Sequence, residues 1–328
     1  MNRFLKISFS LLLIISLGLA ALAGCSDAPG KIKIGVVQLV EHPALDASYQ
    51  GFVDALKDAG YVDGDKITIN YQNGQGEQAN CQTIATQFLN EKMDLILAIT
   101  TPAAQATANV IKNIPILVTA VTDPQDAKLV NTNASPGGNV SGTSDLTPVK
   151  EQFDLMKKLL PDVKKIAVLY TSSESNSVFQ ANLAKSAAAT LGIEVIEATV
   201  SSSNEIQQVV ESVLDKVDAL YIPTDNTFAK GMATVSLVAG PAKMPVIVGE
   251  EGMIASGGLA TIGIDYYKLG YLTGQMAVRI LRDGAKTADM PIEYLKDVTV
   301  TINTDMAAEL GIVIPDDLAQ VNTYKKQD

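Results

Sequence analysis

Six short apolar segments of this sequence form two sets that repeat each other in order and composition. They read KIGVV at 33–37, DLIL at 94–97 and IPILV at 114–118, then KIAVL at 165–169, DALY at 218–221 and MPVIV at 244–248. Short β-branched segments that alternate with amphipathic helical ones are typical of parallel α/β sheets. Two such sets in 328 residues predict two similar, doubly wound Rossmann-like lobes with a cleft between them.

The hydrophobic pattern predicts the individual elements of each lobe. Predicted strands cover 32–39, 67–72, 95–100, 116–120, 166–170, 194–198, 219–223 and 246–249. Predicted helices between them include 48–59, 81–90, 150–160, 178–190 and 204–214. In open α/β sheets of this kind, ligands bind beyond the carboxyl ends of the strands.

Three regions are expected to carry the chain from one lobe to the other. They are the turn-rich stretch 135–145, the strand-to-helix segment 259–267 and the stretch near 291–297. The expected lobes are therefore 31–143 with 266–293, and 144–265 with 294–328. Several crossings side by side would form a multi-strand hinge whose few residues absorb lobe closure.

The N-terminus has the pattern of a sorting signal. Arg3 and Lys6 precede an apolar run at 7–23, which ends in Ala23-Gly24-Cys25. This pattern resembles the bacterial lipobox, which implies a signal peptide at 1–24 and a diacylated Cys25 at the mature N-terminus. The alternative is an N-terminal transmembrane helix, which the shortness of the run disfavours, because a span needs ~20 apolar residues.

Charge and cysteine content narrow the partners. The formal net charge is −11, with one histidine and no basic cluster, so nucleic acid is not an expected partner. Without a polybasic patch for anionic lipid, acyl chains would have to hold the protein at a membrane. Besides Cys25 the only cysteine is Cys81, expected to be a buried structural thiol in place of a reactive one, which leaves no pair for an intramolecular disulfide.

The motif Gly74-Gln75-Gly76-Glu77-Gln78-Ala79 fits the dinucleotide pattern G-x-G-x-x-A. A true fingerprint follows the first strand, with an acid at the end of the next one. Here it follows the second predicted strand, and Asp94 begins a strand instead of ending it. The glycines therefore predict a loop ahead of a helix, and no NAD or other cofactor is expected.

Catalytic motifs are scarce. The sequence has no G-x-S-x-G elbow, no P-loop and no Cys or His pair at metal-ligand spacing, and His42 is its single histidine. We therefore expect neither an enzyme nor a metal site, although a mechanism based on carboxylates alone or with lysine stays open.

Polar residues concentrate in the loops that follow the predicted strands. These loops are 38–43, 100–102, 122–124, 172–177, 224–226 and 250–252. Each alone could simply cap a helix, since Ser, Thr, Asp and Asn are preferred N-cap residues. Their convergence on one edge of both lobes favours a ligand site, where helix N-termini suit an anionic group and Asp225 suits a cation.

Several of these loops resemble those of a known family. The segments are HPALD at 42–46, TDP at 122–124, GTSD at 142–145, ESNS at 174–177, PTDN at 223–226 and GIDYY at 263–267. They are similar to the ABC-transporter substrate-binding proteins that include a tryptophan binder. The resemblance implies a type I periplasmic-binding-protein fold and an aromatic amino acid ligand. Carried onto this sequence, it implies ligand contacts by Gln38, Thr100, Thr122, Ser175, Asn176, Asp225 and Glu250.

In this interpretation Asp225 takes the ligand's α-ammonium, and groups near Thr100, Ser175 and Asn176 take its carboxylate. The expected protein is a monomer, held outside the cell membrane by its lipid, that passes a small solute to an ABC permease. The loop 170–174 reads YTSSE, where the family pattern has Tyr-Asn, so the ligand's class is better defined than its identity. A nucleoside, urea-like or opine ligand stays open, as does a ligand-sensing receptor lobe.

Overall fold

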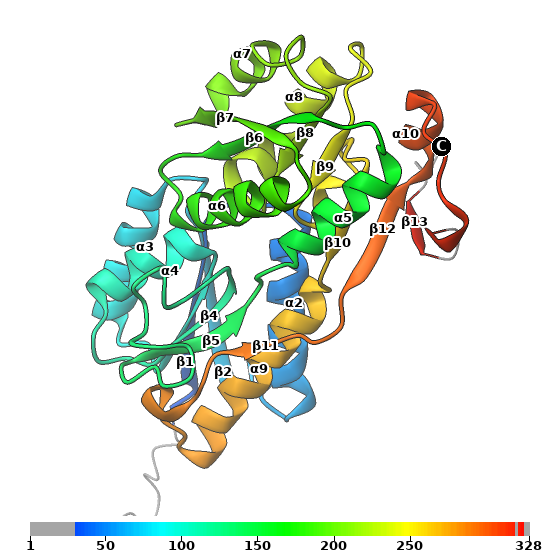
Figure 1. Ribbon diagram of the computed structural model, residues 1–328. Coiled ribbons are helices and arrows are strands. Elements are labelled where there is room, and N and C mark those ends of the chain that lie inside the picture. Colours follow the sequence, from blue (N-terminus) through cyan, green and yellow to red (C-terminus); the bar gives the residue numbers. More distant parts are fainter. Residues whose placement is uncertain (1–29, 319–320, 325–328) are drawn as a thin grey trace, which may run out of the picture. The chain divides into compact units, whose positions relative to one another are not determined.

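The computed structural model of the chain describes residues 30–318 and 321–324 (Figure 1). The fold described below is that of the unit that begins at Lys33. The predicted signal peptide and the predicted lipidation residue Cys25 lie outside the described residues.

The first sheet has six strands in the order β11-β5-β4-β3-β1-β2. Their bounds are β1 Ile32–Gln38, β2 Ile67–Asn73, β3 Leu95–Ile99, β4 Ile116–Val121, β5 Val140–Ser144 and β11 Glu293–Tyr294. The pairings β1–β3, β3–β4, β4–β5 and β5–β11 are parallel. The helices that follow its first three strands are α2 Pro43–Asp58, α3 Gln78–Glu91 and α4 Thr101–Val110.

The second sheet has seven strands in the order β13-β12-β10-β9-β8-β6-β7, and only the pairing β10–β12 is antiparallel among the described pairs. The strands are β6 Lys165–Thr171, β7 Glu194–Val200, β8 Ala219–Ile222, β9 Val246–Val248, β10 Ala260–Gly263, β12 Thr299–Asn303 and β13 Asn322–Tyr324. Its helices are α5 Val149–Leu159, α6 Ser175–Thr190, α7 Ile206–Glu211, α8 Asn226–Ala239 and α10 Thr304–Leu310. The prediction of two parallel α/β sheets is confirmed.

Strand β6 illustrates why these segments form a sheet that is covered on both faces. Ile166, Val168 and Tyr170 pack into one hydrophobic cluster, and the intervening Ala167 and Leu169 pack into another. Successive side chains of a strand point to opposite faces, so an unbroken apolar run fits a sheet with helices on each side.

Helix α9 (Tyr266–Asp283) follows β10 of the second sheet but packs along α2 of the first (Figure 1). The two backbones are so close that a Cβ on Gly270 would lie 1.8 Å from the Ser48 carbonyl oxygen. A Cβ on Gly51 would lie 2.0 Å from the Tyr267 carbonyl oxygen. Glycine is therefore required where α2 and α9 cross, and their contact ties the two halves of the sequence together.

The chain passes between the sheets three times, through 145–148, 264–265 and 295–298. These connections overlap or adjoin the three regions where crossings were predicted, while the exact bounds of the lobes stay a prediction. Two of them meet at the site, because Tyr266, which follows β10, donates a hydrogen bond to Asp145, which follows β5.

Two predicted segments differ from the structure. Residues 140–144, predicted as part of a turn-rich connection, form the inner strand β5, because buried partners satisfy its hydroxyls: Ser141 Oγ donates to the Met290 carbonyl at 2.7 Å, and Thr143 Oγ1 lies 2.8 Å from Thr273 Oγ1. The helix predicted at 204–214 is shorter, consisting of a 3₁₀ turn at Ser203–Glu205 followed by α7.

Candidate functional site

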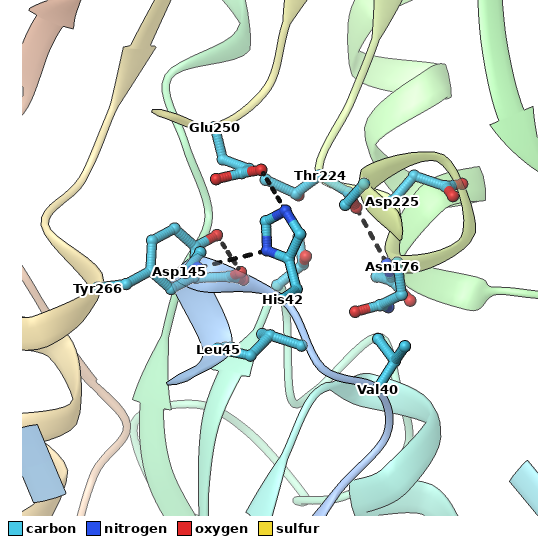
Figure 2. A pocket seen from close by; sticks show the side chains of 14 residues that line it. Val40, His42, Leu45, Asp145, Asn176, Thr224, Asp225, Glu250 and Tyr266 are labelled. Atoms are coloured by element: carbon cyan, nitrogen blue, oxygen red, sulfur yellow. Dashed lines mark hydrogen bonds and ion pairs between the residues drawn. The ribbon is translucent and has the colours of Figure 1, made fainter. Parts of the chain in front are cut away.

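A pocket lies where the carboxyl ends of strands from both sheets meet (Figure 2). Its polar lining residues are His42, Thr122, Asp145, Asn176, Thr224, Asp225, Asn226, Glu250 and Tyr266, and its apolar ones are Val40, Ala44, Leu45, Ala120 and Ala229. The cavity measures ≈ 30 Å³, room for one or two waters. An amino acid could enter only if the walls moved apart.

One end of the pocket holds two buried acids, each with one oxygen that has no hydrogen-bond donor among the described residues. Tyr266 donates to Asp145 Oδ2 at 2.8 Å, and the Thr122 hydroxyl is near enough to lower the pKa of the Asp145 carboxyl, but Asp145 Oδ1 has no partner at hydrogen-bond geometry among the described residues. Glu250 Oε2 accepts from the Gly252 amide, whereas Glu250 Oε1 also has no such partner. The His42 Nε2 atom is 3.6 Å from Glu250 Oε1, too far for a hydrogen bond. We call Asp145, Glu250, His42 and Tyr266 the acid end.

Burial shifts the pKa values of the residues at the acid end. Desolvation raises the pKa of Asp145 to about 6 and that of Glu250 to about 7, and it lowers the pKa of His42 to about 4. At neutral pH the histidine is therefore uncharged while both acids are at least partly ionised. Because no lysine or arginine lines the pocket, the acid end is negative and has no cation of its own.

Two more buried acids are fully occupied: Asp225 at the other end of the pocket, and Glu174 next to it, which lines a neighbouring cavity. Asp225 caps α8 by accepting from the Phe228 amide at 2.8 Å, and it accepts from the Thr171 amide at 2.6 Å and from Thr171 Oγ1 at 2.9 Å. Glu174 accepts from Asn226 Nδ2 at 2.6 Å and from Thr227 Oγ1 at 3.0 Å. We call Asp225 and Glu174 the capped acids, because their donors join the starts of α6 and α8 to β6.

Polar bonds join the first sheet's loops to the second's across the pocket. Gln180 of α6 donates to Thr122 Oγ1 at 3.1 Å, and Gln105 of α4 donates to Ser175 Oγ at 3.2 Å. Together with the approach of His42 to Glu250, these contacts bring the strand ends of the two sheets together.

Four of the seven predicted contact residues line the pocket: Thr122, Asn176, Asp225 and Glu250. Gln38 is not among the lining residues, since it donates to the Val40 carbonyl at 2.9 Å and to Asp46 Oδ1 at 2.7 Å. Neither Thr100 nor Ser175 lines it in this conformation. The buried Thr100 has φ +90° and an unpartnered hydroxyl, and Ser175 accepts from Gln105.

Five polar lining residues were not among the seven predicted contacts. Thr224 and Asn226 flank Asp225 after β8, and the other three are His42, Asp145 and Tyr266. These three follow β1, β5 and β10, so each stands just beyond the carboxyl end of a strand. That placement was the available signal. His42 belonged to the polar loop 38–43 and to the family-like segment 42–46 but was not predicted as a ligand contact. It also caps α2 through Nδ1, which accepts from the Ala44 amide at 3.3 Å.

Within the described ranges, no group of three or more His, Cys, Asp or Glu residues is placed to hold a metal ion. Across the same ranges, no helix is long and apolar enough to cross a membrane. Cys81 is buried, and burial raises the pKa of its thiol to about 11, which keeps the unreactive thiol form.

Comparisons with known proteins identify the family of the chain. The model of the family described as ABC transporter substrate binding protein matches residues 33–326. A "Tyrosine-binding protein" of Clostridioides difficile (strain R20291) is 44% identical over 317 residues, 92% of each chain. An ABC domain from Streptococcus pneumonia, solved with L-Trp, is 41% identical with a TM-score of 0.87, covering 90% of this chain and 99% of that one.

A ligand-free, open substrate-binding protein with adhesive properties from Clostridium difficile is 46% identical but has a TM-score of only 0.70, covering 90% of this chain and all of that one (100%). The lower structural similarity at higher identity indicates that the arrangement here resembles the Trp complex more than the open form. The matches identify the type I periplasmic-binding-protein fold. The chain belongs to the family of ABC-transporter substrate-binding proteins.

Proposed function

We propose that this protein binds an aromatic amino acid in the pocket and delivers it to an ABC permease. The observation that carries the proposal is the acid end: within the described part of the chain, the buried acceptors Asp145 Oδ1 and Glu250 Oε1 have no hydrogen-bond donor, and no lysine or arginine lines the pocket. Burying an unpaired carboxylate is costly, so such a site gains from a ligand that brings a positive charge. The tyrosine-binding relative and the Trp-bound neighbour support an aromatic amino acid as that ligand.

The ligand's ammonium group would lie between Asp145 and Glu250. Asp225, the partner expected from sequence, has both oxygens occupied by Thr171 and Phe228 and offers less to a ligand. An ammonium has three N–H donors, which suits two carboxylates better than one. Asp225 would instead hold the start of α8 in place.

The carboxylate would lie at the start of α6. Helix N-termini present free N–H groups to anions, and the backbone N–H groups of Ser175 and Asn176 have no acceptor in the described structure. The aromatic side chain would pack on Val40, Leu45 and Ala229, the apolar part of the lining. Thr100, Thr122 and Gln38 would complete the site by supporting its loops.

Release would require the sheets to separate. The proposed moving lobes are residues 31–143 with 266–293 and 144–265 with 294–328, joined by the three crossings as a hinge. We further propose an extracytoplasmic monomer anchored through Cys25, whose binding site performs no chemistry on its ligand.

The sequence contains no tryptophan, which gives a direct test. Indole-selective excitation of added tryptophan reports only the ligand, and calorimetry covers tyrosine and phenylalanine. At least one of the three should bind with 1:1 stoichiometry and be recovered unchanged after long incubation. If none of them binds while a nucleoside, urea or an opine does, the proposed ligand class is wrong.

A further inference from the structure

We propose that the cleft also accepts aromatic amino acids extended at their carboxyl end, that is, dipeptides with an aromatic first residue. A second, outer cavity next to the pocket would hold the second residue, and Lys230 would bind its terminal carboxylate. This inference rests on the proposed function, because it assumes that the acid end takes the ligand's ammonium.

The outer cavity has a volume of ≈ 300 Å³ and lies between the Gln75–Gln78 loop of the first sheet and the Ser201–Asn204 loop of the second. It shares Val40 and Asn226 with the inner pocket, so the two spaces adjoin. The outer cavity is about ten times larger than the inner one, and most of its lining is hydroxyl and amide groups. A polar peptide unit suits such walls better than an aromatic ring does.

The direction of the ligand follows from the placement of charge. Figure 2 shows Asp145, Glu250 and Tyr266 on one side of the pocket and Asn176 and Asp225 on the other. The shared residue Val40 lies on the Asn176 side. An ammonium held at the acid end therefore leaves the ligand's carboxyl end nearest the outer cavity. Extension at the carboxyl end is accommodated, whereas extension at the amino end would run into Asp145 and Glu250.

Among the residues that the structure describes, Lys230 is the one cation that lines the outer cavity. No described residue forms a hydrogen bond or ion pair with its ammonium group, which reaches from α8 to 3.8 Å from where a Cβ on Gly76 would stand. Glu174 also lines this cavity, but its carboxyl accepts bonds from Asn226 and Thr227 and burial raises its pKa to about 7, so it repels a ligand carboxylate less than a free acid would. The exposed Glu77 on the opposite wall opposes an anion only weakly, because solvent screens it.

The decisive comparison uses a pair of ligands with the same atoms in opposite order. For the aromatic amino acid that binds best, calorimetry would measure the dipeptide with glycine second, for example Tyr-Gly, and its reverse, Gly-Tyr. We expect Tyr-Gly to bind within about tenfold of the free amino acid, and Gly-Tyr to bind at least about a hundredfold more weakly. Mass spectrometry of the bound fraction excludes free tyrosine as the source of the signal.

Two variants of opposite sign test the role of the outer cavity. Lys230→Gln should weaken Tyr-Gly by about three- to fivefold, the range of a partly exposed ion pair, and leave free tyrosine unchanged. Glu77→Gln should strengthen Tyr-Gly slightly. Lys216→Gln, an exposed lysine outside both cavities, is the matched control and should change neither ligand. The Lys230 effect should fade at high salt.

The outcomes separate the two proposals. If free tyrosine binds and Tyr-Gly does not, the outer cavity is not a ligand site, and the proposed function stands. If Gly-Tyr binds as well as Tyr-Gly, the direction of the ligand is wrong. If Tyr-Gly binds equally to Lys230→Gln, Lys230 has no role. If no aromatic amino acid and no dipeptide binds, the proposed function fails as well.

Discussion

Buried carboxylates lie at the acid end of the pocket and around its other end, but the two groups differ in how many hydrogen bonds they accept. The capped acids, Asp225 and Glu174, accept bonds from the starts of two helices and from β6. At the acid end, Asp145 and Glu250 each keep one oxygen without a donor. A buried carboxylate with a full set of donors stabilises the fold, whereas one short of donors costs free energy until a partner arrives. Donor count therefore separates structural acids from binding acids better than position does.

The largest effect should come from the acid end. Asp145→Asn or Glu250→Gln removes a charge that the ligand's ammonium needs, so the affinity should fall by about 2–5 kcal/mol in binding free energy. Stability should hold or rise, because the cost of a buried unpaired charge is removed. Calorimetry and urea unfolding of the same samples would check both. An unchanged dissociation constant in both variants would place the ammonium elsewhere.

The opposite pattern is expected at the capped end. Asp225→Ala leaves the Thr171 and Phe228 amides without their acceptor, which should lower the free energy of unfolding by roughly 1–3 kcal/mol. Ligand affinity should change less than in Asp145→Asn. Urea unfolding measures the loss. A stable Asp225→Ala protein that no longer binds ligand would restore Asp225 as the ammonium partner.

Acid pH should weaken binding at the acid end, in a pH window where the capped Glu174 also titrates because burial raises its pKa to about 7. The pKa of Glu250 is raised to about 7 and that of Asp145 to about 6, so below these values a protonated acid must lose its proton to bind an ammonium. Affinity should be level above about pH 7.5 and fall by up to about tenfold per pH unit as pH drops through 7 and 6. The neutral His42, with its pKa lowered to about 4, adds nothing in this window. Calorimetry in two buffers of different ionisation enthalpy would count the released proton, and none released at pH 6.5 would contradict the assignment.

A smaller effect on ligand binding is expected at Thr122, which lines the pocket and accepts a hydrogen bond from Gln180. Thr122→Val removes the hydroxyl that accepts from Gln180 across the pocket, which should weaken closure by about 0.5–1.5 kcal/mol. The change should appear as faster ligand dissociation, measured by stopped flow, with folding stability nearly unaltered. Thr132→Val, at an exposed loop threonine, is the matched control. Equal dissociation rates in both variants would show that this bond does not hold the closed form.

Much of the fold could be predicted from the repeated apolar segments, because β6 and its counterparts keep the pattern of a sheet buried on both faces. Strand β5 could not, because its Ser and Thr side chains resemble a loop until Met290 and Thr273 supply partners from distant sequence. The prediction that Asp225 binds the ligand's ammonium failed to foresee its partners for the same reason. The hydrogen bonds that occupy the Asp225 carboxylate come in part from Thr171, which is 54 residues away in sequence. The meeting of Asp145 with Tyr266 spans 121 residues.

The central claim is that the acid end exists to hold a ligand ammonium, and removing that group from the ligand tests it most directly. Calorimetry would compare the aromatic amino acid that binds best with its desamino analogue, which keeps the ring and the carboxylate. The account predicts a loss of about a hundredfold or more, the range for leaving buried charges unpaired. Equal affinity for the two ligands would contradict it.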